Sequence, residues 1–487
     1  MSLLSSIILA PLAGALVILA IPKNKEKLIQ GVGLAFASLC LVLSTYLYLV
    51  FDKTTAAMQF VERMPWIPSF NVNYFVGVDG LSVAIVTLTA LLTLVSLIYS
   101  LNVTLRIKEF FFWFLLLEAG MLGVFVALDF FLFYVFWELT LVPMYFLIGV
   151  WGGPKKEYAA IKFFVYTLFG SLFMLLGVLA LYFSTNPHTL DMLELARQGS
   201  MLPLNKQIWI FLALYLGFAI KVPAFPFHTW LPLAHVEAPT GVSVILAGIL
   251  LKMGTYGIMR VSFPVLPAAT KWFLPFLITI AVINIVYGAF CAMAQKDLKK
   301  MVAYSSINHM GYCMLGMAAM STIGYNGAVM QMITHGVITG SLFLLVGVIY
   351  DRAHTRDIDA FGGLAALFPV YAGIMIIQVM ASLGLPGLAG FVGEFLCFLG
   401  AFQWWPYYAA IGAVGILVTA AFFLRMIEKV FLGPFNEKWA GLKDMNAREL
   451  IAIVPLAALT IIIGVWPRVC LDVINPTITY LVGVMGK

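Results

Sequence analysis

Six ionisable residues lie within long apolar stretches of the sequence, where a charge is costly: Glu138, Lys221, Lys252, His309, His335 and Glu394. A charged side chain at the centre of a bilayer costs at least roughly 2.5–3.5 kcal/mol on insertion scales, and such residues are functional candidates by default. Buried carboxylates, lysines and histidines can exchange protons near neutral pH, because burial shifts their proton affinity. The six residues therefore predict a proton path through a membrane.

A structural role is the alternative for each of these residues. Glu138 can belong to an ion pair that only locks two helices together, and a buried histidine can be neutral and hydrogen-bonded to a neighbouring helix. For His228 and His235, at the ends of apolar stretches, both alternatives stay open, whereas His188 and His354 lie in loops and are expected to be solvated. The lysines indicate a path for protons and not for sodium or potassium ions. A path for those metal cations would have more carboxylate and carbonyl oxygens as ligands, and fewer lysines.

No metal or cofactor site is expected in this chain. The five cysteines are scattered and no two stand at metal-ligand spacing: Cys40, Cys291, Cys313, Cys397 and Cys470. The cysteine ligands of zinc and iron–sulfur sites usually come in pairs that are only a few residues apart. The sequence also carries no flavin or nucleotide motif. We therefore expect no metal and no bound cofactor here.

The composition indicates a membrane protein built of helices. Of 487 residues, 63% are hydrophobic and 10% are charged, whereas a soluble domain has roughly 45–50% and about 25%. This excludes soluble enzymes, nucleic-acid-binding proteins, disordered chains and secreted disulfide scaffolds. The apolar runs reach about 20 residues and do not alternate with period two, so they predict membrane-spanning helices and not a β-barrel. The predicted fold class is an all-α polytopic membrane protein.

Fourteen apolar runs are long enough to cross a bilayer. They cover residues 2–21, 28–50, 78–101, 110–128, 130–150, 158–184, 207–236, 240–261, 272–294, 301–319, 326–350, 366–402, 405–431 and 448–466. The first run lacks a basic leading region and a cleavage site, so we interpret it as a retained span and not as a signal peptide.

The basic residues predict the orientation of these spans. Loops after odd-numbered spans hold 18 of the 28 lysines and arginines, and the opposite side holds 8, including Arg260. Cytoplasmic loops carry the excess of basic residues in membrane proteins. The bias places the loops after odd-numbered spans in the cytoplasm and both termini on the periplasmic side.

Two features five spans apart predict an inverted repeat. Residues 170–178 and 340–348 agree at seven of nine positions. Span 7 is interrupted at residues 222–226, Val-Pro-Ala-Phe-Pro, and span 12 at residues 384–390, which hold three glycines and a proline. Because five is odd, the two copies would cross the membrane in opposite directions. Paired interrupted helices in inverted repeats are typical of transporters, and ordinary proline kinks are the alternative.

The repeat predicts a division of the chain into four parts. Residues 110–261, spans 4–8, and residues 272–431, spans 9–13, would each form a proton half-channel. Residues 1–109 hold spans 1–3, and residues 432–487 hold a loop and span 14.

Two of the candidate residues flank the predicted breaks with the favourable sign of charge. Pro223 disfavours a helical conformation at the preceding residue, so Lys221 should lie at the end of the first half of span 7. The C-terminal end of a helix carries partial negative charge and favours a cation, and the N-terminal end favours an anion. Glu394 should lie in the first turns of the second half of span 12, where an anion is favoured.

Three motifs give the chain a resemblance to a known family. Residues 136–144 (FWELTLVPM), 221–232 (KVPAFPFHTWLP) and 234–240 (AHVEAPT) resemble the antiporter-like proton-channel subunits of respiratory complex I. The resemblance runs from span 3 to span 13. It implies fourteen helices with two inverted five-helix bundles and discontinuous helices 7 and 12.

The resemblance also implies roles for individual residues. In that family the glutamate matching Glu138 and the lysine matching Lys221 form a gating pair, and the lysine matching Lys252 is the central relay. The chain ends soon after span 14 and carries Glu394 where other members have lysine, so it is similar to the shorter members with glutamate at this position.

A function follows from the resemblance as an expectation. The chain would be a proton-translocating membrane subunit of NADH:quinone oxidoreductase in the bacterial inner membrane, driven by quinone reduction elsewhere in the complex. NADH, FMN, iron–sulfur clusters and quinone would bind partner subunits, and related antiporter-like subunits would lie on both sides. The alternatives are a subunit of a multi-subunit cation/proton antiporter and a scaffold that conducts nothing.

Overall fold

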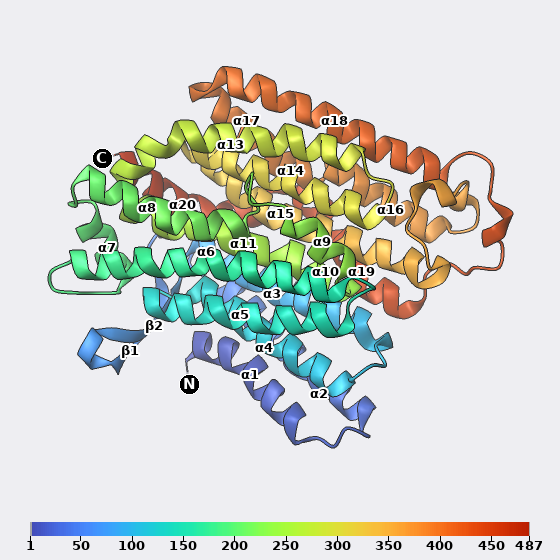
Figure 1. Cartoon of the computed structure of the whole chain (residues 1–487), viewed down its shortest axis with the longest axis horizontal. Helices are drawn as coiled ribbons and strands as arrows, with labels where there is room; N and C mark the ends of the chain where they lie inside the picture. The colour runs from blue at the N-terminus through green and yellow to red at the C-terminus, as the bar shows by residue number, and fades with distance from the viewer. Residues whose placement is uncertain (1, 487) are drawn as a thin grey trace.

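The computed structural model describes residues 2–486, and most of them are helical. The long helices run side by side along the longest axis of the molecule (Figure 1). The helices of the bundle are α1 (Leu3–Ala20), α2 (Glu26–Val50), α3 (Gly80–Tyr99), α4 (Ile107–Val126), α5 (Phe130–Trp151), α6 (Lys156–Ser184), α8 (Leu204–Lys221), α9 (Trp230–Glu237), α10 (Thr240–Ile245), α11 (Leu251–Gly257), α12 (Phe263–Val265), α13 (Pro267–Met293), α14 (Leu298–Ala318), α15 (Thr322–Ala353), α16 (Pro369–Ser382), α17 (Ala389–Trp404), α18 (Pro406–Phe431) and α19 (Ala447–Val465).

Every predicted span coincides with one of these helices or with a group of them. Spans 7 and 12 are each divided in two, as predicted: α8 and α9 are separated by residues 222–229, and α16 and α17 by residues 383–388. The all-helical membrane fold is thereby confirmed. The count of fourteen crossings and the division into four parts stay predictions.

The eighth predicted span is longer and less regular than the sequence indicates. Helices α10, α11 and α12 form one continuous rod from Thr240 to Val265, joined by the π-helical segments η3 (Leu246–Leu250) and η4 (Ile258–Ser262). All residues of the most apolar stretch of this rod are buried inside the protein. Arg260, near the end of the predicted span, lies in η4 and is 6% exposed, so it is a buried charge and not a residue of the loop that follows.

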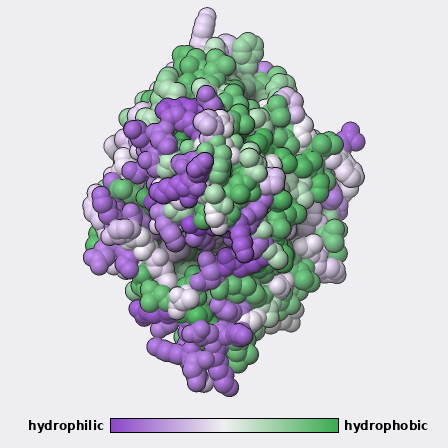
Figure 2. All heavy atoms as spheres, turned by 90° about the vertical axis from the view of Figure 1, so that its right-hand side faces the viewer, coloured by the Kyte–Doolittle hydropathy of each residue, from purple (hydrophilic) through white to green (hydrophobic). Residues whose placement is uncertain are grey.

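The bundle has two distinct ends. The N- and C-termini both lie at the left-hand end in Figure 1, apart from one another, and we call this end the terminal end. The loops after α1, α3, α5 and α15, and the long loop between α18 and α19, lie at the right-hand end, which we call the basic end. Figure 2 looks onto the basic end, where hydrophilic side chains cover much of the middle, the left and the lowest part of the face, and apolar ones lie mainly at the top and on the right.

A hairpin and two peripheral helices cover the terminal end, and the span predictions do not include them. Strands β1 (Gln59–Ile67) and β2 (Val72–Val78) pair antiparallel in the segment between α2 and α3. Helix α7 (Met192–Gly199) lies between α6 and α8. Asp129, the N-cap of α5, accepts a hydrogen bond from the Asn73 amide at 2.9 Å and so attaches β2 to the bundle.

Helix α20 (Arg468–Gly486) lies across the terminal end and does not run through the bundle. Its length and composition alone would allow a membrane crossing. Its partners, however, are residues at the terminal end of other helices: Tyr48 of α2, Gly80 of α3 and Tyr325 of α15. The C-terminus therefore lies at the same end as the N-terminus (Figure 1).

The two halves of the molecule pack their broken helices in the same way. Helix α6 packs against both α8 and α9, and α15 packs against both α16 and α17. Residues 152–154, just before α6, and the end of α15 line one cavity at the basic end, so α6 begins where α15 ends and the two helices run in opposite directions. This arrangement supports the predicted inverted repeat, which stays a prediction.

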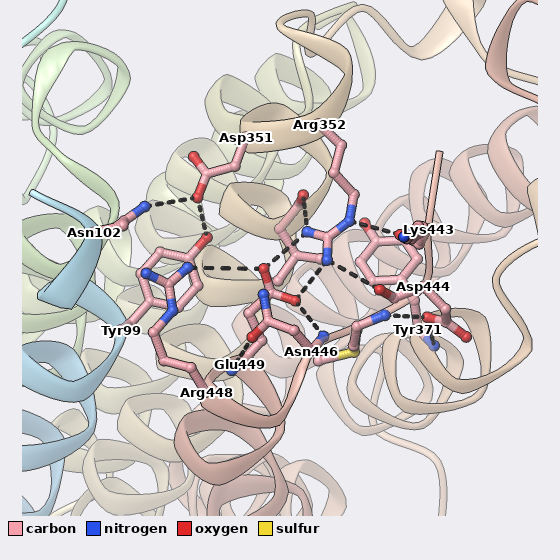
Figure 3. Close-up of polar contacts among 12 residues, drawn as sticks. Tyr99, Asn102, Asp351, Arg352, Tyr371, Lys443, Asp444, Asn446, Arg448 and Glu449 are labelled. Atoms are coloured by element: carbon pink, nitrogen blue, oxygen red, sulfur yellow. Dashed lines mark hydrogen bonds and ion pairs between the residues drawn. The ribbon is translucent and has the colours of Figure 1, made fainter. Parts of the chain in front are cut away.

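A polar cluster fixes α15, α19 and α3 to one another at the basic end (Figure 3). The Arg352 guanidinium donates to both carboxylate oxygens of Glu449 at 2.8 Å. Asp351 accepts hydrogen bonds from Tyr99 at 3.1 Å and from Asn102 at 3.2 Å. Bidentate arginine–carboxylate pairs are among the strongest polar contacts in proteins. The cluster therefore holds the ends of these helices in a defined register.

Candidate functional site

Lys252 lies at the centre of the bundle in contact with a histidine. Its side chain is fully buried, and its Nζ lies 2.5 Å from the Nδ1 atom of His335 in α15. The Lys252 ammonium also donates to the Ala247 carbonyl at 2.6 Å. Since an ammonium group only donates hydrogen bonds, His335 Nδ1 accepts from it in this arrangement. A proton can pass directly between these two residues.

The π-helical segment before Lys252 explains its position. Ala247 belongs to η3, five residues before Lys252, and its carbonyl lies within reach of the lysine side chain. Single π-helical turns inside α-helices occur often at functional sites. Here the segment turns a backbone carbonyl towards the lysine and holds the Nζ atom beside His335.

The second histidine continues the path from His335. The rings of His309 and His335 are 5.4 Å apart between centroids. The His309 Nε2 atom lies 3.1 Å from the hydroxyl of Ser382, the last residue of α16. Gln331, one turn before His335, lies with its amide nitrogen 3.4 Å from His309 Nδ1. The histidines of α14 and α15 therefore lie one after the other, with His335 next to Lys252.

Glu394 ends this series at the break between α16 and α17. Its Oε1 atom lies 3.3 Å from His309 Nδ1, and both side chains are buried. Glu394 is the sixth residue of α17, in the first turns of the second half-helix, as predicted. The chain turns through Gly384, whose φ is +80°, and a Cβ there would lie 2.7 Å from Glu394 Oε2. Glycine therefore allows the backbone to approach the carboxylate.

A small cavity lies between these groups. It measures about 10 Å³, and its walls include His309, His335, Ser382 and Glu394. A cavity needs roughly 10–15 Å³ to hold one water molecule, together with polar partners. Both conditions are met, so the space between the histidines and Glu394 suits one bridging water.

Lys221 lies at the break in span 7, as predicted. It is the last residue of α8 and 2% exposed. Its Nζ lies 5.3 Å from the ring centroid of Trp137 and 5.7 Å from that of Phe163. Aromatic faces attract a cation at such distances. No hydrogen bond joins Lys221 to Lys252 in the described part of the chain.

Two side chains form hydrogen bonds with backbone groups at the span-7 break that have no partner within a helix. Asn284 of α13 donates to the Pro223 carbonyl at 3.0 Å and accepts from the Phe225 amide at 2.8 Å. The Trp230 indole donates to the Ile220 carbonyl at 2.9 Å. Buried backbone groups need such partners because an unpaired one is costly. The break is therefore a built feature of the fold.

Glu138 is the candidate least integrated into the site. It lies in α5 and is half-buried, with an enclosed Oε1 atom that has no hydrogen-bond partner in the protein. Within residues 2–486, no contact of 4 Å or less joins it to Lys221. Trp137, the neighbouring residue, faces Lys221 instead. The two members of the expected gating pair are thus near one another but separate.

Of the remaining four histidines, two are buried in the bundle and two are exposed in loops. His235 is fully buried and stacks on Phe343 with ring centroids 4.5 Å apart. His228 is 3% exposed and packs against Phe225 and Tyr287. His188 and His354 are exposed, as expected for loop residues.

Several polar residues of the site were not among the sequence predictions. Ser382, Gln331 and Asn284 are neutral residues of a kind common in helices, so their sequence positions carry no signal. Glu118 is different, because it is a carboxylate in the fourth span and fully buried in α4. Neither of its oxygens has a hydrogen-bond partner in the protein. Its position inside an apolar run is a sequence signal of the same kind as that of Glu138.

Comparison with known proteins identifies the family. The family model described as "NADH:quinone oxidoreductase/Mrp antiporter, TM" matches residues 127–421, which include both broken spans. This chain belongs to that family. Among curated relatives, NADH-quinone oxidoreductase subunit M of Rickettsia bellii is 42% identical over 98% of both chains. NADH-ubiquinone oxidoreductase chain 4 of Marchantia polymorpha is 40% identical over 98% of this chain and 97% of its own. Both names agree with the resemblance to complex I subunits that the sequence motifs show.

Solved structures agree with the fold. A chain of respiratory complex I from Thermus thermophilus superposes with a TM-score of 0.91 at 32% identity, over 99% of this chain and 100% of its own. A chain of the Mrp complex from Dietzia sp. superposes with a TM-score of 0.87 over 100% of both chains. At 20% identity, this second likeness shows a shared fold only.

Proposed function

We propose that this family member is a proton-translocating membrane subunit of an NADH:quinone oxidoreductase. The observation that carries the proposal is the 2.5 Å contact between Lys252 and His335 at the centre of the bundle. Full-length relatives that are subunits of this enzyme support the assignment. In this proposal quinone reduction in the rest of the complex drives proton movement here.

The relay runs from Lys221 through Lys252, His335 and His309 to Glu394. Direct contacts connect Lys252 to His335, and His309 to Glu394. The cavity between the histidines and Glu394 provides room for one water. The step from Lys221 to Lys252 has no direct contact and requires water between the two ammonium groups.

Glu138 controls this first step in our proposal. Approach of Glu138 to Lys221 stabilises the lysine cation, and separation favours transfer of its proton towards Lys252. Two unit charges at 4 Å interact by about 4 kcal/mol at an effective dielectric of 20. Moving one charge against 100 mV requires about 2.3 kcal/mol, so opening the pair is sufficient in scale. The separation of Glu138 from Lys221 in the structure corresponds to the open pair.

The redox chemistry belongs to partner subunits in this proposal. NADH, FMN, iron–sulfur clusters and quinone bind there, and related antiporter-like subunits flank this chain in the bacterial inner membrane. The basic end faces the cytoplasm and the terminal end the periplasm, because cytoplasmic loops carry the excess of lysine and arginine.

Membrane vesicles from a strain that lacks this chain test the proposed function. Complementation with the wild-type gene should restore NADH-driven proton uptake into inside-out vesicles, equally with and without sodium. Proton uptake that requires sodium, or that proceeds in response to a sodium gradient without NADH, would instead support a cation/proton antiporter. Restoration by an assembled complex with Lys252→Ala at the full rate would support a scaffold.

A further inference from the structure

A buried ion pair lies at the terminal end of the rod that carries Lys252. The Arg260 Nη2 atom lies 2.5 Å from Asp79 Oδ1, with side chains 5% and 2% exposed. Arg260 lies eight residues beyond Lys252, about 12 Å along the helix at 1.5 Å per residue. The mechanism proposed above makes no use of this pair.

Neither member of the pair can pass a proton on. Arginine stays protonated in proteins, so Arg260 offers no acceptor. Asp79 Oδ1 accepts hydrogen bonds from the backbone amides of Leu81 and Ser82, at 3.1 and 3.2 Å, in addition to the one from Arg260. All three donors meet the same carboxylate oxygen and hold Asp79 in place against Arg260. Since the carboxylate offsets the arginine charge, the pair blocks a proton by offering it no free acceptor and not by electrostatic repulsion.

The surroundings of the pair are closed and packed. The Tyr256 hydroxyl accepts from Arg260 Nε at 3.2 Å and donates to the Phe125 carbonyl at 3.1 Å. The rings of Phe125 and Tyr256 meet edge to face at 5.2 Å, and both side chains are fully buried. The hydroxyl of Ser82 lies 3.1 Å from that of Tyr256. These contacts leave the polar groups of the pair engaged with the protein.

Helix α20 covers the pair from outside. The Gly80 amide, next to Asp79, donates to the Thr477 hydroxyl at 3.0 Å. A Cβ at Gly80 would lie 2.1 Å from the Val473 carbonyl, so glycine is needed for this close approach of α20 to α3. The helix across the terminal end is thus joined directly to the residue that caps α3.

The opposite, basic end of α3, of the rod and of α15 is open. A cavity of about 310 Å³ lies there, and its walls include Tyr99 of α3, Thr240 of α10 and Asp351 of α15. Lys299, whose Nζ donates to the Ala238 carbonyl at 2.5 Å, also lines it. The helices around Lys252 therefore enclose a cavity at the basic end. At the terminal end they enclose the Asp79–Arg260 ion pair, which α20 covers.

We propose that the Asp79–Arg260 pair beneath α20 is a barrier that stops protons at Lys252 from leaving through the terminal end of the rod, so that they leave through His335. The proposal rests on the proposed function and adds a positioning role for residues that carry no proton themselves.

Passive proton leak measures this barrier directly. The assembled complex with Arg260→Gln should, in proteoliposomes without NADH, dissipate an imposed pH gradient several-fold faster than the wild type. With NADH it should translocate fewer protons per electron pair. Arg260→Lys keeps the positive charge, so its proton leak should stay close to the slow wild-type rate. A wild-type leak and a wild-type proton ratio in assembled Arg260→Gln would overturn the proposal.

Two further variants complete the test. If Arg260→Gln does not assemble, Thr477→Val, which removes the α20 contact, should leak faster than wild type, and a wild-type rate would again overturn the barrier. In the Lys252→Ala/Arg260→Gln double variant the leak should return to the wild-type rate, because the leaking proton passes through Lys252. A persistent leak contradicts the barrier alone, whereas normal pumping by Lys252→Ala contradicts the proposed function.

Discussion

Lys252 and His335 share one hydrogen bond, which joins the lysine to the pair of neighbouring histidines. His335 Nδ1 accepts from Lys252, and its Nε2 atom is buried without a partner in the protein. That second nitrogen is available to a water or to the next carrier. Histidine can relay a proton through its two nitrogens because one donates while the other accepts. The geometry therefore supports transfer through His335 towards His309.

Replacing either histidine should interrupt the path. We expect His335→Phe and His309→Phe each to reduce NADH-driven proton translocation at least tenfold, because phenylalanine fills the site without a proton acceptor. The initial rate of fluorescence quenching by a pH-sensitive dye in vesicles measures this. His354→Gln, at an exposed loop residue, is the matched control. Full translocation by either phenylalanine variant would remove that histidine from the path.

Single residues show how far sequence reasoning reaches at this scale. Lys221, Lys252 and Glu394 could be predicted because a charge inside an apolar run is costly and therefore informative. The separation of Glu138 from Lys221 could not be, because it depends on side-chain conformations around Trp137. Ser382 carries no comparable signal, since a serine in a membrane helix is inexpensive.

Broken helices position the charged residues at the scale of elements. Prolines and glycines made both breaks predictable, but the side chains that satisfy the broken backbone come from other helices. Asn284 of α13 supplies both hydrogen bonds to residues 223–225. Likewise, the π-helical segments on either side of Lys252 could not be predicted, because no pattern in the sequence marks them.

Removing the support of the span-7 break should loosen it. Asn284→Leu keeps a similar volume and leaves the Pro223 carbonyl and the Phe225 amide unpaired. Each buried unpaired group costs about 1–3 kcal/mol, so we expect faster hydrogen–deuterium exchange in residues 222–229. Asn205→Leu, at an exposed position in α8, is the control. Unchanged exchange in Asn284→Leu would show that this side chain does not hold the break.

The attachment of the hairpin to α5 should depend on pH. Burial raises the pKa of Asp129 to about 6, and the Asp191 carboxylate adds to this effect. Because the folded pKa lies above the unfolded value, the folded state binds more protons between about pH 4 and 6, and stability falls as pH rises through this range. Asp129→Asn keeps a capping oxygen and removes the titration.

Local protection around Asp129 measures this dependence. After correction for intrinsic rates, amides of residues 72–78 should be less protected at pH 7 than at pH 5 in the wild type, by on the order of 2 kcal/mol at most. In Asp129→Asn the protection should be the same at both pH values. Higher protection at pH 7 in the wild type would contradict the sign of the effect.

At the scale of the whole molecule, the two ends of the bundle differ in charge and in cover. Composition predicted the helical membrane fold, whereas the alternation of the loops across the membrane and the sides of the termini stay predictions. In the structure both termini lie at the same end of the bundle (Figure 1). The helix α20 shows the limit of composition, because its sequence could cross a membrane and only its contacts with Gly80 and Tyr325 place it across the terminal end.

Sidedness can be tested with a membrane-impermeant maleimide. In inside-out vesicles, which expose the cytoplasmic face, Lys438→Cys at the basic end should be labelled, and Met201→Cys at the terminal end should not. Both positions are exposed in the structure. The unsubstituted protein, with its native cysteines, gives the background. The reverse labelling pattern would invert the proposed orientation.

The stoichiometry of proton translocation in Lys252 variants tests the central claim most directly. In proteoliposomes that contain equal amounts of assembled complex, Lys252→Ala should translocate fewer protons for each NADH oxidised than the wild type, because the contact with His335 is lost. Lys252→Ala with the wild-type proton ratio, at normal NADH oxidation, would contradict a proton path through the centre of this bundle.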